Sequence, residues 1–463
     1  MRGAVYTVRE LADKESELRL YDGNILGTPV WRLLRFKIRT NYYKKNTEFN
    51  NKSNKKEAIN KVTLVKCFFN SFYKLAKLLI VSEKRGNIVF AFPRLAKLND
   101  IYLDKFTDPV IEYTDIRDDF LIFQRSLSGI HNKPRCHDKQ TIETDFIDIT
   151  AKILGVILFP IFFLCYMRTI LRIYKKTKDL YALGVSFIIT SSAELGEFYV
   201  KHTFVKLILS KLKARNIFIV NRGAFAPVIV SARKLNAKVY EMQHGVTLSD
   251  TILYAGQYHP IADPDYFLVF GEKWIASQFY MPLEKIINIG WAYKRMVQNS
   301  LQLPDFPDNC ILVISSPSCT FKLFKLVVKL AKEFPEYEFH IRLHPQEGYR
   351  DEQYKAIEQI DNISMDNHKV DSAVVIHQYK YIVGENSSVL YEALCLNKRV
   401  ARLDMEGIVI KDQNNNTTTG FSYVKNMKDF KDFLNPKEGK NDLENLGIYD
   451  DFKEEVVNTL IKN

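Results

Sequence analysis

The chain has 463 residues, of which 46% are hydrophobic and 13% aromatic, which suits folded cores and argues against a disordered protein. Its length exceeds what one hydrophobic core usually serves, so we expect two domains. The formal charge of +12 favours anionic partners. Because paired zinc-type cysteines and an RNA-binding aromatic signature are lacking, we expect no nucleic acid, but a membrane surface or a phosphorylated substrate.

The six cysteines are scattered without a repeating spacing, and no cleavable signal is evident at the start of the sequence. This pattern predicts reduced thiols in a cytoplasmic protein. Cys136 and His137, with His131 nearby, lack a fourth ligand at a recognisable spacing, so the sequence predicts no metal site.

Residues 1–85 are expected to form an N-terminal extension, with an amphipathic opening around Trp31 and a Lys/Asn-rich loop after it. From Gly86 onward, short apolar runs alternate with polar turns and helical segments, which predicts an α/β domain over 86–300. Its expected strands are 87–92, 185–190, 216–220, 238–243, 266–270 and 285–289.

Residues 153–178 form a segment that could contact a membrane. The stretch 153–167 is apolar throughout, but at about 15 residues it is short for a spanning helix and contains Pro160. Two interpretations stay open: a helix that dips into the bilayer and keeps its cations at lipid phosphates, or a buried helix with a solvated end. The cations that follow are Arg168, Arg172, Lys175, Lys176 and Lys178.

Residues 301–309, with two prolines, predict a linker, and a second α/β domain is expected over 310–463. A helix over 321–334 gathers four lysines on one face, which is either solvated or set against anionic lipid. The tail from Pro436 is expected to end in a helix. The strands expected in this domain are 310–315, 338–343, those around Ile363 and Ala373, 379–383 and 398–403.

Three polar motifs follow directly on expected strands. Open parallel sheets bind ligands at the carboxyl ends of their strands, where loops face a crevice and helix N-termini present free amides. The three motifs are therefore expected to open onto one cleft. They are Gln243-His244-Gly245, Arg342-Leu-His344-Pro345 and Gly384-Glu-Asn386-Ser387-Ser388.

The last motif predicts a phosphate site. Asn386, Ser387 and Ser388 precede a helical run, so hydroxyls and free backbone N–H groups come together there. Glu392, one turn later, could accept hydrogen bonds from two ribose hydroxyls. An ordinary helix N-cap and a solvent-facing glutamate explain the same residues.

His344 is expected to donate to a phosphate oxygen and to stabilise charge on a leaving nucleotide, with Pro345 fixing the next turn. Arg342, two residues earlier on the same side of the strand, could face the same anion. The alternative is a histidine that only bonds a backbone carbonyl.

His244 is our first candidate for a general base, since a neutral imidazole could remove a proton from an acceptor hydroxyl and Gly245 permits close approach of a ligand. Glu194, after the strand expected at 185–190, is a second catalytic candidate, with Glu197 and Asp250 as further ones. A structural histidine and solvated carboxylates are the alternatives.

His-Pro followed about forty residues later by paired serines, with a His-Gly step ahead of both, resembles a group of bacterial glycosyltransferases over about residues 215–405. The group comprises sialyltransferases, capsule Kdo transferases and CDP-glycerol glycerophosphotransferases. The resemblance implies the GT-B fold, two Rossmann-like domains facing a central cleft, and CMP- or CDP-activated donors. It assigns His344 to leaving-group departure, Ser387 and Ser388 to phosphate binding, and His244 to the base. The acidic pair before a glycine that supplies the base in many sialyltransferases is not evident here.

The sequence thus predicts a nucleotide-sugar-dependent glycosyltransferase of capsule, O-antigen or lipopolysaccharide biosynthesis, acting on a surface polysaccharide or lipid-linked glycan. We expect no cofactor other than the nucleotide-activated sugar as co-substrate, and a place at the cytoplasmic face of the inner membrane. Three alternatives remain: a UDP- or GDP-sugar donor on the same fold, a non-catalytic membrane-associated assembly protein, and a nucleotide-sugar epimerase.

Overall fold

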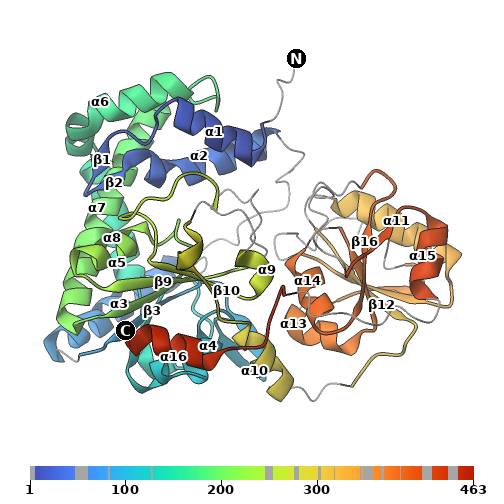
Figure 1. Ribbon diagram of the computed structural model, residues 1–463. Helices are drawn as coiled ribbons and strands as arrows, with labels where there is room; N and C mark the ends of the chain where they lie inside the picture. The colour runs from blue at the N-terminus through green and yellow to red at the C-terminus, as the bar shows by residue number, and fades with distance from the viewer. Residues whose placement is uncertain are drawn as a thin grey trace.

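In the computed structural model, two parallel sheets with helices packed around them lie side by side (Figure 1). The residues that the structure describes are 6–46, 61–81, 84–126, 129–245, 254–275, 281–300, 304–316, 319–344, 347, 357, 359–366, 370–385, 387–408, 420–435 and 447–462.

The first sheet has seven strands in the order β11-β10-β9-β8-β3-β6-β7, and every neighbouring pair is parallel. Its central strands are fully buried, which is why they read in sequence as continuous apolar runs. The strands are β3 (Asn87–Ala91), β6 (Phe120–Gln124), β7 (Thr141–Glu143), β8 (Asn216–Val220), β9 (Lys238–Met242), β10 (Tyr266–Val269) and β11 (Ile286–Asn288).

The second sheet has six strands in the order β14-β13-β12-β15-β16-β17, again all parallel. The chain crosses from β12 out to β14 and then returns to β15, so the order reverses between β12 and β15, where an open α/β sheet places its ligand crevice. The strands are β12 (Cys310–Ile314), β13 (Glu338–Arg342), β14 (Ile363–Met365), β15 (Tyr381–Gly384), β16 (Arg399–Leu403) and β17 (Ser422–Val424).

Helices cover both sheets, and the described residues also form two short antiparallel ribbons and four 3₁₀ turns, Asp115–Asp118, Asp138–Gln140, Leu283–Lys285 and Ile376–Gln378. The helices are α1 (Val8–Glu17), α2 (Val30–Asn46), α3 (Lys61–Val81), α4 (Asp108–Glu112), α5 (Asp145–Ile157), α6 (Phe159–Thr177), α7 (Ser186–Leu212), α8 (Ala226–Lys234), α9 (Glu272–Ile275), α10 (Ala292–Ser300), α11 (Thr320–Glu333), α13 (Ser372–Val375), α14 (Ser388–Cys395), α15 (Met427–Leu434) and α16 (Glu454–Lys462). The ribbons pair β1 (Asn24–Ile25) with β2 (Thr28–Pro29), and β4 (Ala96–Leu98) with β5 (Ile101–Leu103).

The described part of the N-terminal extension is an integral part of the first domain. Trp31 of α2 is buried in one core with Ile170 of α6 and Leu195 of α7. Helix α3 contacts α5 and β7. Both contacts bury apolar faces that the first 85 residues could not bury alone.

Two predicted strands are wrong. Residues 185–190 were expected as a strand, but they begin the long helix α7. Phe187, Ser191 and Leu195 are buried along it at four-residue spacing, so helical packing overrides the β propensity of a short β-branched run. The expected strand around Ala373 is the short helix α13, which Asp371 caps by accepting from the Ala373 N–H at 3.0 Å.

The C-terminal segment crosses back to the first domain, although the sequence placed residues 310–463 in the second. Figure 1 shows α16 beside α4, on the side of the first sheet. The Tyr240 hydroxyl of β9 donates to the Leu460 carbonyl at 2.8 Å, and the Trp274 indole donates to the Ile448 carbonyl at 2.5 Å. Gly290, at φ +73°, lets the returning backbone pass at Asp451, where a Cβ atom would collide with it.

Helices α5 and α6 form a bent pair over the apolar segment singled out above. Among the helices that the structure describes, none is long and apolar enough by itself to cross a membrane. Together α5 and α6 meet the length and composition criteria, but they are bent by 70° at their junction.

Candidate active site between the two sheets

The first sheet contributes His244 at the carboxyl end of β9. Its half-buried imidazole packs against the rings of Phe92 and Phe106, and Nδ1 lies 3.2 Å from the Tyr254 hydroxyl. Burial, and secondarily the positive charge of Arg222, lower the pKa of His244 to about 4. The ring is therefore neutral at physiological pH, so one of its two nitrogens is available to accept a hydrogen bond.

A buried charge network stands behind His244. The Arg222 backbone N–H donates to Glu241 Oε1 at 2.8 Å, and its guanidinium pairs with the other oxygen of that carboxylate. The same guanidinium lies 3.5 Å from Asp263, and Tyr254 donates to Glu241 Oε1 at 3.4 Å. This network connects the ends of β8 and β9 and orients the tyrosine that touches His244.

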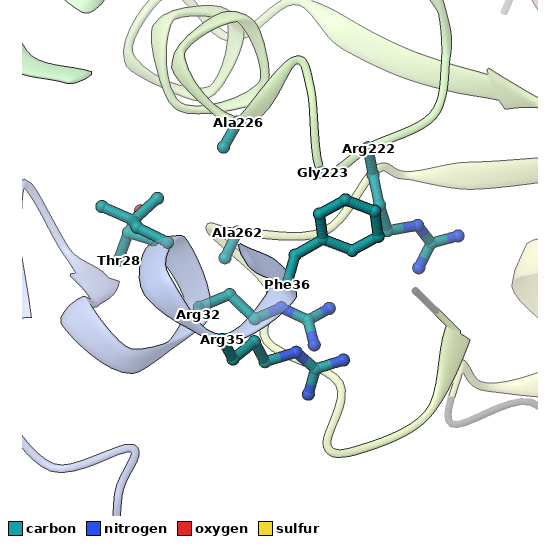
Figure 2. A pocket seen from close by; sticks show the side chains of 9 residues that line it. Thr28, Arg32, Arg35, Phe36, Arg222, Gly223, Ala226 and Ala262 are labelled. Atoms are coloured by element: carbon teal, nitrogen blue, oxygen red, sulfur yellow. The ribbon is translucent and has the colours of Figure 1, made fainter. Parts of the chain in front are cut away.

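A pocket opens beside this network, and Figure 2 shows three guanidinium groups extending the same way along it. Arg32 pairs with Asp263, and Arg35 donates to Tyr21 at 2.7 Å. Each of the three guanidinium groups already has a carboxylate partner, Asp263 for Arg32, Glu15 for Arg35 and Glu241 for Arg222, so their charges are compensated within the protein. Its walls are Thr28, Arg32, Leu33, Arg35, Phe36, Arg222, Gly223, Ala226 and Ala262.

The second sheet contributes His344, directly after β13. Its backbone N–H donates to Glu347 Oε2 at 2.5 Å, while the Ser315 hydroxyl, at the end of β12, donates to Oε1 at 2.9 Å. Thr320, the first residue of α11, also donates to that carboxylate. The Glu347 carboxylate therefore lies where two strands end and a helix begins, a position suited to anions.

His344 is half-buried, and burial, followed by the charge of Arg94, lowers its pKa. Arg94 lies in the loop after β3, so the two domains approach each other at this histidine. A neutral imidazole beside a guanidinium can donate one hydrogen bond to a phosphate oxygen without repelling the arginine.

Ser387 caps α14, because its hydroxyl accepts from the Val389 N–H at 3.3 Å. This is the ordinary N-cap interaction that the sequence left open as an alternative. Ser388, the first residue of the helix, is half-buried. The predicted binding residues Pro345 and Asn386 lie outside the residues that the structure describes.

Glu392 lies where the two domains meet, rather than facing solvent. Its side chain is 3% exposed, and Oε1 is 3.6 Å from the Lys105 ammonium of the first domain. Oε2 has no hydrogen-bond partner among the residues described. Burial raises the pKa of this carboxyl, and Lys105 opposes that rise. A buried acceptor oxygen without a donor is costly, so a ligand hydroxyl would stabilise it.

Two predicted site residues are engaged in other contacts. The Arg342 guanidinium pairs with Asp366 and donates to the Val370 carbonyl at 2.6 Å. Glu194 is on α7, a helix that packs on α5, α6 and α8, and its carboxylate pairs with Lys37. None of these contacts of Arg342 and Glu194 involves His244 or His344.

Sequence reasoning missed Arg94, Lys105, Arg222 and Tyr254. Each is a single polar residue whose partner lies on another element, so no local spacing marks it. Only Arg222 could have been found from the sequence, because it follows the buried strand β8 as His244 follows β9.

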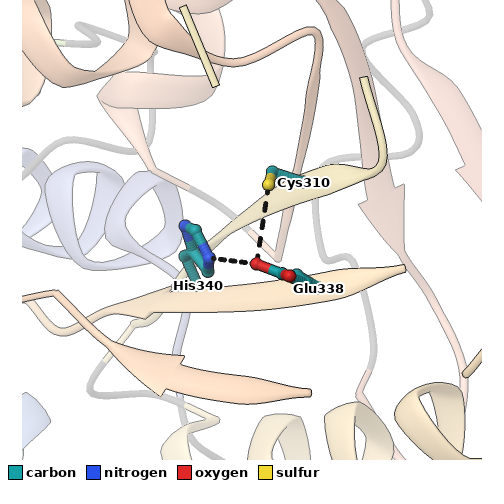
Figure 3. A group of neighbouring side chains, drawn as sticks. All are labelled: Cys310, Glu338 and His340. Atoms are coloured by element: carbon teal, nitrogen blue, oxygen red, sulfur yellow. Dashed lines mark hydrogen bonds and ion pairs between the residues drawn. The ribbon is translucent and has the colours of Figure 1, made fainter. Parts of the chain in front are cut away.

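A separate group of potential metal ligands lies at the opposite edge of the second sheet. Figure 3 shows Cys310 and Glu338 at the amino ends of β12 and β13, with His340 two residues farther along β13. Their ligand atoms lie within 4.8 Å of one another. Since the candidate site lies at the carboxyl ends of these strands, this group takes no part in it.

Known structures share this two-domain architecture. UDP-GlcNAc 2-epimerase from Methanocaldococcus jannaschii is 12% identical, with 82% of this chain and 100% of that chain covered and a TM-score of 0.51. The Neisseria meningitidis UDP-GlcNAc 2-epimerase bound to UDP-GlcNAc is also 12% identical, with the same coverage and a TM-score of 0.50. No family model matches the sequence, and no curated protein matches it either.

At such low identity the likeness establishes the fold, and it confirms the predicted fold class. The chain has a GT-B-type fold, with two Rossmann-like domains facing a central cleft. The two domains contact each other where Lys105 of the first approaches Glu392 of the second.

Proposed function

We propose that this chain is a glycosyltransferase that moves a sugar from a nucleotide-activated donor, CMP- or CDP-linked, to a surface polysaccharide or lipid-linked glycan. Glu392 carries the proposal. Its buried carboxylate has one oxygen near Lys105 and one that still lacks a donor among the described residues. The two hydroxyls of a ribose offer donors of the required kind.

In the proposed reaction the acceptor hydroxyl oxygen forms a bond to the sugar carbon, and the bond from that carbon to the nucleotide phosphate breaks. We assign the acceptor proton to His244, whose imidazole is neutral before the step and whose low pKa makes it a weak base. The electron pair leaves on the phosphate, where a hydrogen bond from His344 and the charges of Arg94 and Lys105 stabilise it. Because these groups supply the positive charge, we propose a reaction that needs no metal ion.

The similar architectures also motivate two alternatives. The Neisseria epimerase binds UDP-GlcNAc, so a UDP- or GDP-sugar donor is the second candidate for the transferase. A nucleotide-sugar epimerase is the third, because that is the activity named for both structures. An epimerase converts its nucleotide sugar without any acceptor, whereas a transferase needs one.

Incubation with CMP-, CDP-, UDP- and GDP-sugars, with and without extracted glycan, separates these activities. We expect release of CMP or CDP that depends on the glycan. Release of UDP or GDP would show that the donor is a UDP- or GDP-sugar. Formation of a new nucleotide sugar without glycan would show that the protein is an epimerase. Thermal stabilisation by the free nucleotides gives an independent ranking, because a ligand at a hundred times its Kd stabilises by about 2.7 kcal/mol.

A non-catalytic role in polysaccharide assembly would be recognised differently. In that case, His344→Ala would leave glycan production in cells unchanged while the protein remained folded. We expect production to fall instead.

A further inference from the structure

A row of exposed apolar side chains runs along the outward face of the bent pair α5–α6. Ile153, Val156, Ile157, Ile161 and Leu164 are each between 54% and 71% exposed. Within each helix they follow three- and four-residue spacing, so three of them share one face of α5 and two share one face of α6. We call these five side chains the apolar ridge.

The fold fixes the ridge in its outward position. Gly155 of α5 lies directly against α7, where an added Cβ would come within 2.7 Å of the Glu197 backbone nitrogen. Gly196 of α7 faces it in return, with the Gly155 carbonyl 3.0 Å from its own Cβ position. Such close backbone packing leaves α5 no room to rotate its exposed face inward.

Cations border the ridge, whereas residues 153–167 carry no charge. Lys152 precedes it, and Arg168 and Lys175 follow on α6; all three are exposed and form no ion pair with any residue in the described ranges. An apolar strip between unpaired cations matches the layers of an anionic bilayer, with its acyl chains beneath phosphates.

We infer that the apolar ridge docks into the headgroup boundary of an anionic lipid bilayer, with α5 and α6 lying in its surface. The 70° bend and the short apolar stretch suit a surface position better than a span. Figure 1 shows α6 on the side of the first domain that lies away from the second domain, so docking there leaves the second domain uncovered. The inference rests on the proposed function only in that a lipid-linked acceptor gives the docking a purpose.

Sedimentation of the full chain with lipid vesicles tests the inference. The vesicles consist of phosphatidylcholine alone or of phosphatidylcholine mixed with phosphatidylglycerol. We expect wild-type protein to sediment with the anionic vesicles. The double variant Ile157→Glu/Leu164→Glu should bind at least tenfold more weakly, since burying one such side chain is worth about 1.5–3 kcal/mol.

Two further variants separate the apolar and electrostatic parts. Arg168→Gln and Lys175→Gln should each weaken binding to anionic vesicles about fivefold, because each cation near such a surface contributes about 1 kcal/mol. Leu283→Glu is the matched control, since Leu283 is 63% exposed in the 3₁₀ turn Leu283–Lys285 of the first domain. We expect this control to bind as the wild type does.

The inference fails if the wild-type protein sediments with neither kind of vesicle. It also fails if Ile157→Glu/Leu164→Glu binds the anionic vesicles as tightly as the wild type does. It also fails if sedimentation velocity shows a wild-type dimer that this double variant abolishes, because a second copy would then cover the ridge. Circular dichroism and thermal unfolding of each variant exclude misfolding. Nucleotide stabilisation of the same samples reports on the proposed function separately, so the two can fail independently.

Discussion

The polar groups that the two domains contribute to the candidate site differ in how deeply they are buried. At the edge of the first sheet, Arg222, Glu241 and Asp263 are buried, and Arg32 supplies the second cation that balances the two carboxylates. At the edge of the second sheet, His344, Ser387 and Ser388 are only half-buried. If the proposed roles hold, the base has a rigid charged network behind it in one domain, and the ligand-binding groups of the other domain have none.

The largest effect is expected from breaking the buried network of the first domain. Glu241→Gln removes one charge from a pair that is excluded from water, which typically costs about 3–5 kcal/mol of unfolding free energy. Asp366→Asn is the counterpart in the second domain, where Arg342 and Asp366 retain 10% and 14% exposure. Urea unfolding should show a clearly smaller loss for Asp366→Asn. Equal losses would contradict the proposed difference between the two edges.

His344→Ala should remove one donor to the leaving phosphate. Loss of one such hydrogen bond typically lowers kcat about 10²–10³-fold. His377→Ala is the control, because His377 is half-buried in the same domain and burial also lowers its pKa. Nucleotide release should fall for the first variant and stay at the wild-type rate for the second. An equal rate for the wild type and both variants would show that His344 does not take part in the reaction.

His244 should make the protein sensitive to acid. Its folded pKa of about 4 lies below the 6.5 of an exposed histidine, so between these values the unfolded chain binds more protons. Stability is therefore full above pH 6.5 and is lost as the pH falls towards 4, by up to about 3 kcal/mol before allowance for solvent screening. His244→Gln should flatten this slope in urea unfolding at pH 7, 5.5 and 4.5. An unchanged slope would place the acid sensitivity elsewhere.

Glu392 should distinguish ribose from deoxyribose. If its carboxylate accepts from a sugar hydroxyl, a 2′-deoxynucleotide loses a hydrogen bond to a charged group, worth about 1.5–3 kcal/mol, or at least tenfold in Kd. Glu392→Gln should reduce this preference, whereas Glu338→Gln, at the opposite edge of the sheet, should retain it. Calorimetric titration of both nucleotides measures the ratio. Equal affinities for the wild-type protein would argue against ribose binding at Glu392.

The sequence was sufficient for most of the two sheets because buried parallel strands such as β8 and β12 are uninterrupted apolar runs. It also identified the strand ends where His244 and His344 lie. It failed at 185–190, since a short β-branched run does not distinguish a strand from the start of a buried helix. It could not find the approach of Lys105 to Glu392, because that contact depends on how the domains meet.

Arg342 shows a second limit of the sequence. Its position two residues before His344 predicted a shared ligand. The guanidinium instead contacts Asp366 and the Val370 carbonyl, both of which follow β14 in the sequence. Alternation along a strand indicates which side a residue faces, not which partner it meets there.

The smallest effect is expected at Glu194, which the sequence offered as a catalytic base. Its partner Lys37 has a side chain that is 61% exposed, and pairs of this kind contribute about 0–1 kcal/mol. Glu194→Gln should therefore change the unfolding free energy by less than about 1 kcal/mol and leave nucleotide release unaltered. Reduced nucleotide release by Glu194→Gln at unchanged stability would indicate that Glu194, rather than His244, is the general base. Because Glu241→Gln should cost about 3–5 kcal/mol in the same domain, comparing it with Glu194→Gln distinguishes a buried charge network from a solvated ion pair.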